Sequence, residues 1–280
     1  MNRCVAVLTI LCSLALAPVT KAADDPALIA RGKYLAIAAD CAACHSGPDA
    51  KPFAGGVALK TPFGAIVSAN ITPDPVAGIG GWTETEFISA LWEGRGRGGR
   101  RLFPAMPYTA YTQMAREDVV AIFAYLKTVD AVPAKVETNQ LPFPFNIRSG
   151  MAVWNLLNFR AERFQPNPAR SERWNRGRYL VDVLEHCGVC HTPKNFLGAD
   201  KSSSYLKGGT LQGWYAPNIA PDKEKGIGSW KDQELFDLFR SGQTGNVIAS
   251  GPMAEVVSKS TMYLTDDDLN AIIAYLKDKL

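Results

Sequence analysis

The stretch CAACH at residues 41–45 has a counterpart in CGVCH at residues 187–191, and this repeated pattern decides how the rest of the chain is interpreted. Two cysteines stand three positions apart, and a histidine follows the second cysteine at once. Two such thiols can add across the two vinyl groups of one porphyrin, and the adjacent imidazole then lies under the iron as its proximal ligand. The pattern therefore predicts two covalently attached haem c groups, held by Cys41, Cys44 and His45 and by Cys187, Cys190 and His191.

A pair of cysteines at this spacing also occurs in redox disulfides and in zinc sites. Neither alternative explains why a histidine follows both pairs. A zinc ribbon places its second pair about 15–20 residues after the first, whereas the first cysteines of the two motifs here, at positions 41 and 187, are 146 residues apart. Haem attachment is the interpretation that accounts for all six residues.

The first 22 residues have the organisation of an export signal. Arg3 provides the basic start, residues 5–17 form an apolar core shorter than a membrane span, and Ala22 is the small residue that cleavage needs. We therefore expect residues 1–22 to be a signal peptide and the protein to be periplasmic, which fits the compartment in which haem c is attached. An uncleaved anchor is the alternative.

Cysteine and charge counts exclude other classes of protein. Without residues 1–22, four of the six cysteines remain, all inside the two motifs, and 28 basic residues stand against 27 acidic ones. No thiol is left over for a disulfide or for thiolate ligation. A chain so close to neutral lacks the basic surface of a nucleic-acid-binding protein, so we expect no nucleic-acid partner.

The similarity between the two halves of the chain extends well beyond the motifs. The matched stretches are GKYL at 32–35 with GRYL at 177–180, NITPD at 70–74 with NIAPD at 218–222, and AYLK at 124–127 with AYLK at 274–277. Their offsets run only from 145 to 150 residues, so the copies differ by short loop insertions. We interpret them as two tandem copies of one haem domain, at residues 26–130 and 171–280.

Apolar residues recur at helical spacing within each copy, and long loops separate these stretches. The expected helices cover 84–92 and 116–128 in the first copy and 174–185, 232–240 and 266–279 in the second. Thr265 with Asp268 three residues on resembles a capping box. Alternating patterns typical of strands are scarce, so we expect an all-α fold.

The segment 131–170 between the copies is rich in proline but includes an apolar stretch, 151–164, that can form one helix. Four of its side chains, Trp154, Leu156, Leu157 and Phe159, are too apolar for a free linker. We therefore expect an ordered strap that packs along both domains.

The sixth iron ligand decides whether each haem carries electrons or performs chemistry. The chain has three histidines: two are proximal, and His186 directly precedes the second motif, on the wrong side to reach across its own haem. Methionine remains. Met106 and Met253 lie 147 residues apart, at the repeat offset, and each precedes the last helix of its copy. Met114 and Met262, 148 residues apart, are rivals that we rank lower because no proline flanks them. Histidine and methionine together fill all six coordination positions of the iron, which favours electron transfer.

Two further features have more than one interpretation. A glycine-rich loop before the first candidate methionine carries the arginines Arg95, Arg97, Arg100 and Arg101. The loop is either simply solvated, or it is a docking face or a partner for haem propionates, since clustered arginines attract carboxylates. Trp82 and Trp230 occupy equivalent positions, where they either pack in the core or donate a hydrogen bond to a propionate.

These residues resemble those of the membrane-associated cytochrome c subunits of bacterial alcohol, gluconate and related dehydrogenases. The strongest stretches are 70–74, 104–108, 118–127, 142–154 and 251–257. The resemblance implies two class I cytochrome c-like domains, Met106 and Met253 as sixth ligands, and a catalytic subunit as electron donor. The chain departs from the family pattern because it has two haem domains, whereas those subunits usually have three and a membrane-associating tail.

Together these observations predict a dihaem cytochrome c that transfers electrons and is not itself an enzyme. The donor would be a periplasmic dehydrogenase of the flavin, quinoprotein or molybdenum type, and the acceptor a downstream cytochrome, an oxidase or a quinone. We expect the protein to be soluble or peripherally bound at the periplasmic face of the inner membrane. The alternative is a dihaem peroxidase or a haem sensor, either of which needs one open coordination site.

Overall fold

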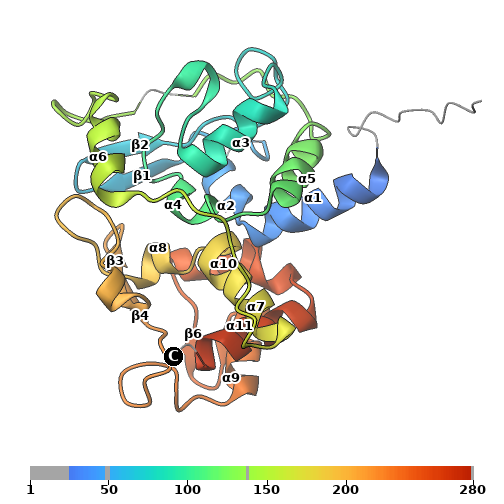
Figure 1. Ribbon diagram of the computed structural model, residues 1–280, viewed down its shortest axis with the longest axis vertical. Helices are drawn as coiled ribbons and strands as arrows, with labels where there is room; N and C mark the ends of the chain where they lie inside the picture. Colours follow the sequence, from blue (N-terminus) through green and yellow to red (C-terminus); the bar gives the residue numbers. More distant parts are fainter. Residues whose placement is uncertain (1–24, 48–50, 137–138, 279–280) are drawn as a thin grey trace, which may run out of the picture.

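The computed structural model describes residues 25–47, 51–136 and 139–278. The signal peptide predicted at 1–22 lies outside the described residues. The described chain forms two mainly helical halves, which lie one above the other in Figure 1, with the earlier half drawn in blue and green and the later one in yellow to red. One apolar core runs through both halves and includes Leu35 and Ile122 from the first and Leu180 and Ile272 from the second.

The first half begins and ends with long helices. Its elements are α1 (Pro26–Ala38), α2 (Cys41–His45), β1 (Ala58–Thr61), β2 (Gly64–Val67), α3 (Glu84–Glu93), α4 (Tyr108–Tyr111) and α5 (Arg116–Leu126). Helix α6 (Gly150–Asn158) follows before the second half. Asp25 starts α1 by accepting a hydrogen bond from the backbone N–H of Ala27, with proline at the first helical position.

The second half repeats this order. Its elements are α7 (Glu172–Tyr179), the π-helical turn η3 (Leu180–Leu184), α8 (Gly188–His191), β3 (Lys207–Leu211), β4 (Trp214–Asn218), α9 (Asp232–Ser241), β5 (Gln243–Thr244), β6 (Val247–Ile248), α10 (Pro252–Lys259) and α11 (Asp266–Lys277). Short 3₁₀ turns at 97–99, 202–204 and 261–263 complete the described elements.

The first and last helices of each half cross at a glycine. Helix α1 packs against α5, and α7 packs against α11. A Cβ atom on Gly32 would lie 1.8 Å from the carbonyl oxygen of Ala121, and one on Gly177 would lie 1.9 Å from that of Ala271. Only glycine lets the two backbones approach so closely, which explains why both copies of the repeated GKYL-type stretch begin with it.

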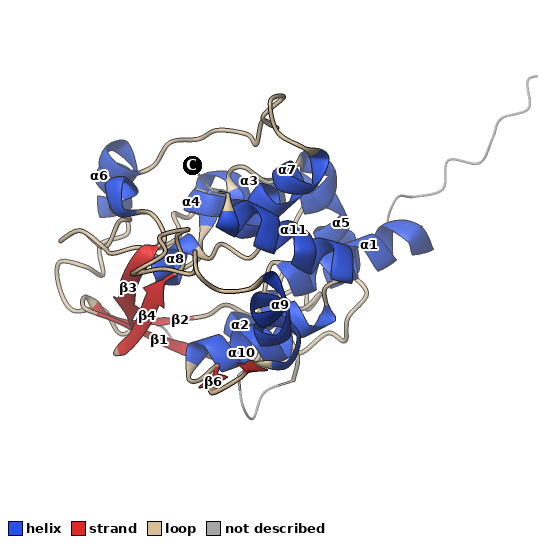
Figure 2. Ribbon diagram, turned by 90° about the horizontal axis from the view of Figure 1, so that it is seen from below, coloured by secondary structure: helices blue, strands red, loops and turns tan. Residues whose placement is uncertain are grey.

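The described residues are rich in helix, as expected, but they also contain three short antiparallel hairpins, β1–β2, β3–β4 and β5–β6 (Figure 2). The all-α prediction omitted them. Gln212 and Gly213, between β3 and β4, have φ angles of 53° and 82°, as a two-residue turn of type I′ requires. Strands of two to five residues are too short to show a clear alternation in sequence.

The segment expected to be a strap contacts both halves. Gln140 and Ala65 exchange two backbone hydrogen bonds of 2.8 and 3.0 Å at the β1–β2 hairpin. On α6, the indole Nε1 of Trp154 donates to the carbonyl oxygen of Leu197 in the second half at 2.8 Å. Trp154 is buried, so α6 lies between the two halves at this point.

The helix expected over 151–164 is shorter than predicted, because α6 ends at Asn158. Beyond it the backbone N–H of Phe164 donates to the carbonyl oxygen of Gln113 in the first half, at 3.1 Å. The helix itself ends because Phe159 is extended, with φ −121° and ψ 133°. Leu156 and Leu157, both expected to pack, are 83% and 66% exposed.

Candidate functional site

Helix α2 carries the first motif directly after a sharp turn. Asp40 adopts the left-handed conformation, with φ 47° and ψ 34°, and separates α2 from α1. Cys41 and Cys44 lie one helical turn apart on α2, and both are half-buried. Burial raises the pKa of Cys41 to about 12 and that of Cys44 to about 11. Both thiols are therefore protonated at neutral pH, unlike a reactive thiolate.

The second motif is built in the same way. The π-helical turn η3 leads to His186, which has a φ of 40° and so adopts the same left-handed turn as Asp40. Cys187 then caps α8, and Cys190 lies one turn further on. Burial raises the pKa of both thiols. Each thiol pair therefore stands on a short helix behind an equivalent turn.

The two motif histidines make equivalent hydrogen bonds. Nδ1 of His45 lies 2.6 Å from the carbonyl oxygen of Ala69, and Nδ1 of His191 lies 2.7 Å from that of Pro217. A carbonyl oxygen can only accept, so each Nδ1 carries the proton and each Nε2 keeps its lone pair. Burial lowers the pKa of both imidazoles. A neutral ring with a free Nε2, oriented through Nδ1, is what a proximal iron ligand requires.

The candidate methionines lie next to proline in both halves. Met106 is in the loop before α4, and Met253 follows Pro252 in the first turn of α10; both are half-buried. The rival Met114 is completely enclosed in the core, and Met262 is 38% exposed. A sulfur atom surrounded by protein on all sides has no room for iron, which supports the lower rank of Met114. The assignment of Met106 and Met253 stays a prediction.

His186 is half-buried and packs against the first half of the molecule. Its ring stacks on that of Tyr111 of α4, with the centroids 5.4 Å apart and the planes 16° apart. It also lines a cavity of about 180 Å³ together with Asp182 and Tyr205. The sequence predicted a partly exposed side chain at a helix end but could not predict this contact between the halves.

The arginine-rich loop lies at the surface, where Arg95, Arg97 and Arg100 are exposed. The guanidinium of Arg97 is 3.7 Å from the carboxylate of Glu86, and that of Arg95 is 3.9 Å from Glu93. Such exposed pairs are weak and leave the arginines accessible to another carboxylate. Trp82 and Trp230 are half-buried and pack against the core, which agrees with the packing interpretation of both.

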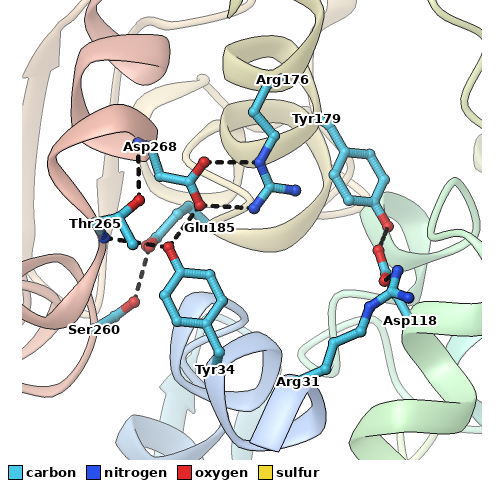
Figure 3. A network of polar contacts seen from close by, with 9 residues as sticks. All are labelled: Arg31, Tyr34, Asp118, Arg176, Tyr179, Glu185, Ser260, Thr265 and Asp268. Carbon is cyan, nitrogen blue, oxygen red and sulfur yellow. Dashed lines mark hydrogen bonds and ion pairs between the residues drawn. The ribbon is translucent and has the colours of Figure 1, made fainter. Parts of the chain in front are cut away.

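A reciprocal set of polar contacts joins the two halves (Figure 3). Asp118 of α5 accepts hydrogen bonds from Arg31 of α1 at 2.5 Å and from the hydroxyl of Tyr179 of α7 at 2.7 Å. The same hydroxyl accepts from the backbone N–H of Ala115 at 3.0 Å. Tyr179 thus crosses from the second half to the start of α5 in the first.

The equivalent contact runs in the opposite direction. Asp268 of α11 accepts two hydrogen bonds from Arg176, of 2.7 and 2.8 Å, and one from the hydroxyl of Tyr34 of α1, at 2.6 Å (Figure 3). Thr265 caps α11 as predicted, but its backbone N–H donates to the Tyr34 hydroxyl at 3.3 Å. Of the two hydrogen bonds of a capping box, only the one from the backbone N–H of Asp268 to the Thr265 side chain forms. The predicted return bond from the Asp268 carboxylate is wrong, because this carboxylate binds Arg176 and Tyr34 instead.

The two motifs lie near the contact between the halves, which we call the seam; it is formed by α1, α2, α4 and α5 of the first half and α7, η3, α10 and α11 of the second. Helix α10, which carries Met253, packs against α2, and α4, which follows Met106, packs against η3. The charge of Cys190 contributes to the raised pKa of Cys44. The thiols of the two motifs are thus close enough to influence each other across the seam.

Several residues of this seam were missed by sequence reasoning. Tyr34 and Tyr179 belong to the matched GKYL and GRYL stretches, and Asp118 and Asp268 occupy equivalent positions 150 residues apart. The repeat therefore marked these residues as equivalent, but it did not show that each tyrosine reaches the aspartate of the other half. Asp40, just before the first motif, gave no signal of its own.

The donor set fits a covalently bound haem in both halves. Each half presents two protonated thiols one turn apart, a neutral imidazole oriented for metal binding, and a half-buried methionine beside a proline. Helical units of this kind, closed by a glycine crossing of the first and last helices, define a haem-attaching cytochrome.

Comparison with known proteins identifies the family. The sequence pattern of the cytochrome c family matches residues 29–130 and 175–279. The chain belongs to the cytochrome c family. The two matched segments coincide with the two halves of the molecule.

The relatives include both longer and similar-sized chains. The chain is 47% identical to the fructose dehydrogenase cytochrome subunit of Gluconobacter japonicus, over 93% of this chain and 54% of the relative. It is 40% identical to the gluconate 2-dehydrogenase cytochrome c subunit of Pantoea cypripedii, over 91% of this chain and 61% of the relative. The chain thus spans little more than half the length of these two relatives.

A relative of similar length is the diheme cytochrome c-type protein of Cereibacter sphaeroides, 39% identical over 91% of this chain and 89% of the relative. Two of these relatives are named as cytochrome subunits of dehydrogenases and one as a diheme cytochrome, which supports electron transfer by a cytochrome. Within the described ranges, no helix is long and apolar enough to cross a membrane.

Proposed function

We propose that this protein is a dihaem cytochrome c in which two covalent haems, one in each half, carry electrons from a dehydrogenase to a downstream respiratory acceptor. Residues 26–130 and 171–280 would form the two tandem cytochrome c domains, and residues 131–170 the strap between them. Cys41 and Cys44 would bind the first haem and Cys187 and Cys190 the second. The axial ligands would be His45 with Met106 and His191 with Met253.

The haem iron supplies the redox change, and the protein fixes its ligands and its surroundings. Nε2 of each motif histidine would be available to bind the iron, because Nδ1 is fixed on a backbone carbonyl oxygen. The thioether of each methionine would fill the sixth position and raise the reduction potential. With histidine and methionine at both axial positions, each site would favour electron transfer over the binding of oxygen or peroxide.

The observation that carries this proposal is the pair of equivalent hydrogen bonds from His45 to Ala69 and from His191 to Pro217. Each bond selects the neutral tautomer with a free Nε2, and each occurs next to two protonated thiols. The same arrangement occurs in both halves of the chain. Two histidines that only packed in the core would not need matching hydrogen bonds beside two thiols.

The donor follows from the relatives by analogy. Two of them are named as cytochrome subunits of fructose and gluconate dehydrogenases, and we propose a periplasmic dehydrogenase of the flavin, quinoprotein or molybdenum type as donor here. A cytochrome, an oxidase or a quinone would take the electron onward. The protein would be exported by residues 1–22 and would work in the periplasm or at the periplasmic face of the inner membrane.

An optical titration of the purified holoprotein tests this function. We expect two haems per chain, a methionine-to-ferric-iron charge-transfer band of full strength for two haems, and no spectral change when carbon monoxide is added to the reduced form. A half-strength band together with carbon monoxide binding at one haem would contradict the proposal. That result would instead indicate a peroxidase or a sensor with one open site.

A further inference from the structure

A buried carboxylate without a partner lies just before the first motif. Asp40 is 8% exposed, and its Oδ1 is the only buried side-chain oxygen or nitrogen among the described residues that lacks a hydrogen bond. Buried polar atoms are nearly always paired, so an exception calls for a physical reason. Nothing in the fold of α2 requires a carboxylate here, because the Asp40 side chain does not cap that helix.

Asp40 directly precedes the first motif and also acts electrostatically on a cysteine of the second. Its charge contributes to the raised pKa of Cys44 in the first motif and of Cys190 in the second. Helix α10 of the second half packs against α2, and Glu255 and Lys259 of α10 both act on Asp40. The carboxylate is therefore within electrostatic reach of the attachment points of both haems.

The groups around Asp40 leave it without a stable counter-charge. Lys259 is 3.5 Å from Glu255 on the same helix, so its positive charge is largely balanced there. Glu185 accepts a hydrogen bond from Ser260, and burial raises its pKa well above the usual range. Burial also raises the pKa of Tyr111 far above the usual range. Neither Glu185 nor Tyr111 supplies a positive charge to the Asp40 carboxylate.

Burial raises the pKa of Asp40 from its ordinary value of 3.8 to about 8. The charge of this carboxylate therefore changes near neutral pH, and the 8% of Asp40 that is exposed leaves a route for a proton from water. The equivalent position in the second half is His186, which stacks on Tyr111. The carboxylate is therefore present on one side of the seam only.

We propose that Asp40 takes up a proton when an adjacent haem is reduced, so that electron transfer through this protein is coupled to protonation at the seam. The inference rests on the proposed function, because it needs covalent haems at both motifs. One ferric iron gains one electron from the donor and becomes ferrous, and one Asp40 carboxylate gains one proton from water and becomes a carboxylic acid. No other bond forms or breaks, and oxidation reverses both changes.

The coupling works through charge. An electron added to the iron makes the neighbouring carboxylate anion less favourable, and by reciprocity the anion makes reduction less favourable. When Asp40 is protonated, the reduction potential should be higher and independent of pH. As Asp40 loses its proton at higher pH, the potential of the nearer haem should fall.

Spectroelectrochemical titration of the holoprotein, at pH values on both sides of the Asp40 pKa, tests the coupling. In the wild type we expect the potential of at least one haem to fall as the pH rises through this region. In Asp40→Asn we expect a flat dependence, and at alkaline pH a higher potential than in the wild type. The control is Asp74→Asn: Asp74 is also 8% exposed, but its carboxylate accepts the backbone N–H groups of Val76 and Ala77, so the slope should remain.

Two surface variants test the same coupling without changing the buried site. Lys259→Gln removes a charge that lowers the Asp40 pKa, and Glu255→Gln removes one that raises it. The pH region of the slope should therefore move up in Lys259→Gln and down in Glu255→Gln. In redox-difference infrared spectra, a carboxylic acid C=O band should appear on reduction of the wild type above the Asp40 pKa and be absent in Asp40→Asn.

A slope that persists unchanged in Asp40→Asn would overturn the coupling and assign the pH dependence to another group, such as a haem propionate. A wild type without any slope, or surface variants that leave its position unchanged, would overturn it as well. These results differ from a failure of the proposed function, which would show as fewer than two haems per chain or as carbon monoxide binding in the same samples.

Discussion

At the scale of single residues, the proposed sites depend on atoms that are free to bind a metal because other contacts hold the rest of the side chain. His45 and His191 each use Nδ1 for a backbone carbonyl oxygen and keep Nε2 available. The cysteines and histidines were predictable from sequence because their spacing is fixed by the chemistry of the porphyrin. The methionines were predicted from their repeat offset, their place before the last helix of each copy and the proline beside each, and their ligation stays a prediction.

Replacement of Met106 or Met253 by alanine tests the sixth ligands. Each variant should lose about half of the methionine-to-iron charge-transfer band and should bind carbon monoxide at one haem when reduced, because one iron loses its thioether. Met262→Ala is the control, since Met262 is 38% exposed and should leave the band intact. Loss of the band in Met262→Ala, but not in Met253→Ala, would reverse the assignment in the second half.

Asp40 also makes the stability of the protein depend on pH. Its pKa is about 8 in the folded protein and 3.8 without the effects of the fold, so between these values the folded state holds the proton more tightly than the unfolded state. The free energy of unfolding should therefore decrease as the pH rises from about 4 through about 8. Urea unfolding of the holoprotein across this range should show the decrease in the wild type and in Asp74→Asn.

Asp40→Asn should remove this part of the pH dependence and make the protein more stable than the wild type at alkaline pH. An equally steep decrease in Asp40→Asn would show that another group is responsible. Asp40 was missed from sequence because an aspartate beside a cysteine has no distinctive pattern. Its importance arises only when α10 of the other half packs against α2.

At the scale of elements, the helices were predictable because their apolar faces and caps are local features. The expected helices at 84–92 and 232–240 agree with α3 and α9 to within one residue at either end. The hairpins were not predictable, because strands of two to five residues carry too little pattern. Helix α6 was predicted too long because the chain becomes extended at Phe159 and then contacts Gln113 through Phe164, and a contact between segments so far apart in sequence leaves no local pattern.

The glycine crossings give a prediction at this scale. Gly177→Ala would place a methyl group 1.9 Å from the carbonyl oxygen of Ala271, so α7 and α11 would have to move apart. We expect a loss of about 1–3 kcal/mol in the free energy of unfolding, as in other overpacked interiors. Gly150→Ala is the matched control, since a Cβ atom there meets nothing within 4 Å. Equal stability of the two variants in urea unfolding would contradict the close crossing.

At the scale of the whole molecule, two equivalent tyrosine–aspartate contacts hold the halves together. Tyr34 and Tyr179 each donate to an aspartate of the opposite half and accept a backbone N–H at the start of the same helix. The sequence predicted two copies and a strap, but it contained no information on how the copies face each other. That arrangement depends on contacts between residues as far apart as Tyr34 and Asp268.

The double variant Tyr34→Phe with Tyr179→Phe tests the seam. Each substitution removes a hydrogen bond to a buried carboxylate and should cost about 1–2 kcal/mol. Because both lost contacts join the halves, calorimetry should show a lower and broader unfolding transition as the halves begin to unfold separately. Tyr263→Phe is the control, since Tyr263 is 57% exposed. A double variant that unfolds like this control would show that the seam is held by other contacts.

The central claim is that both haems of one chain take up and pass on electrons, and coulometric titration of the holoprotein tests it most directly. The proposed function predicts uptake of two electrons per chain, one at each haem. Both electrons should then pass to an added ferric c-type cytochrome, at a rate that carbon monoxide does not change. Uptake of a single electron, or a reduced haem that binds carbon monoxide and no longer delivers its electron, would contradict the claim.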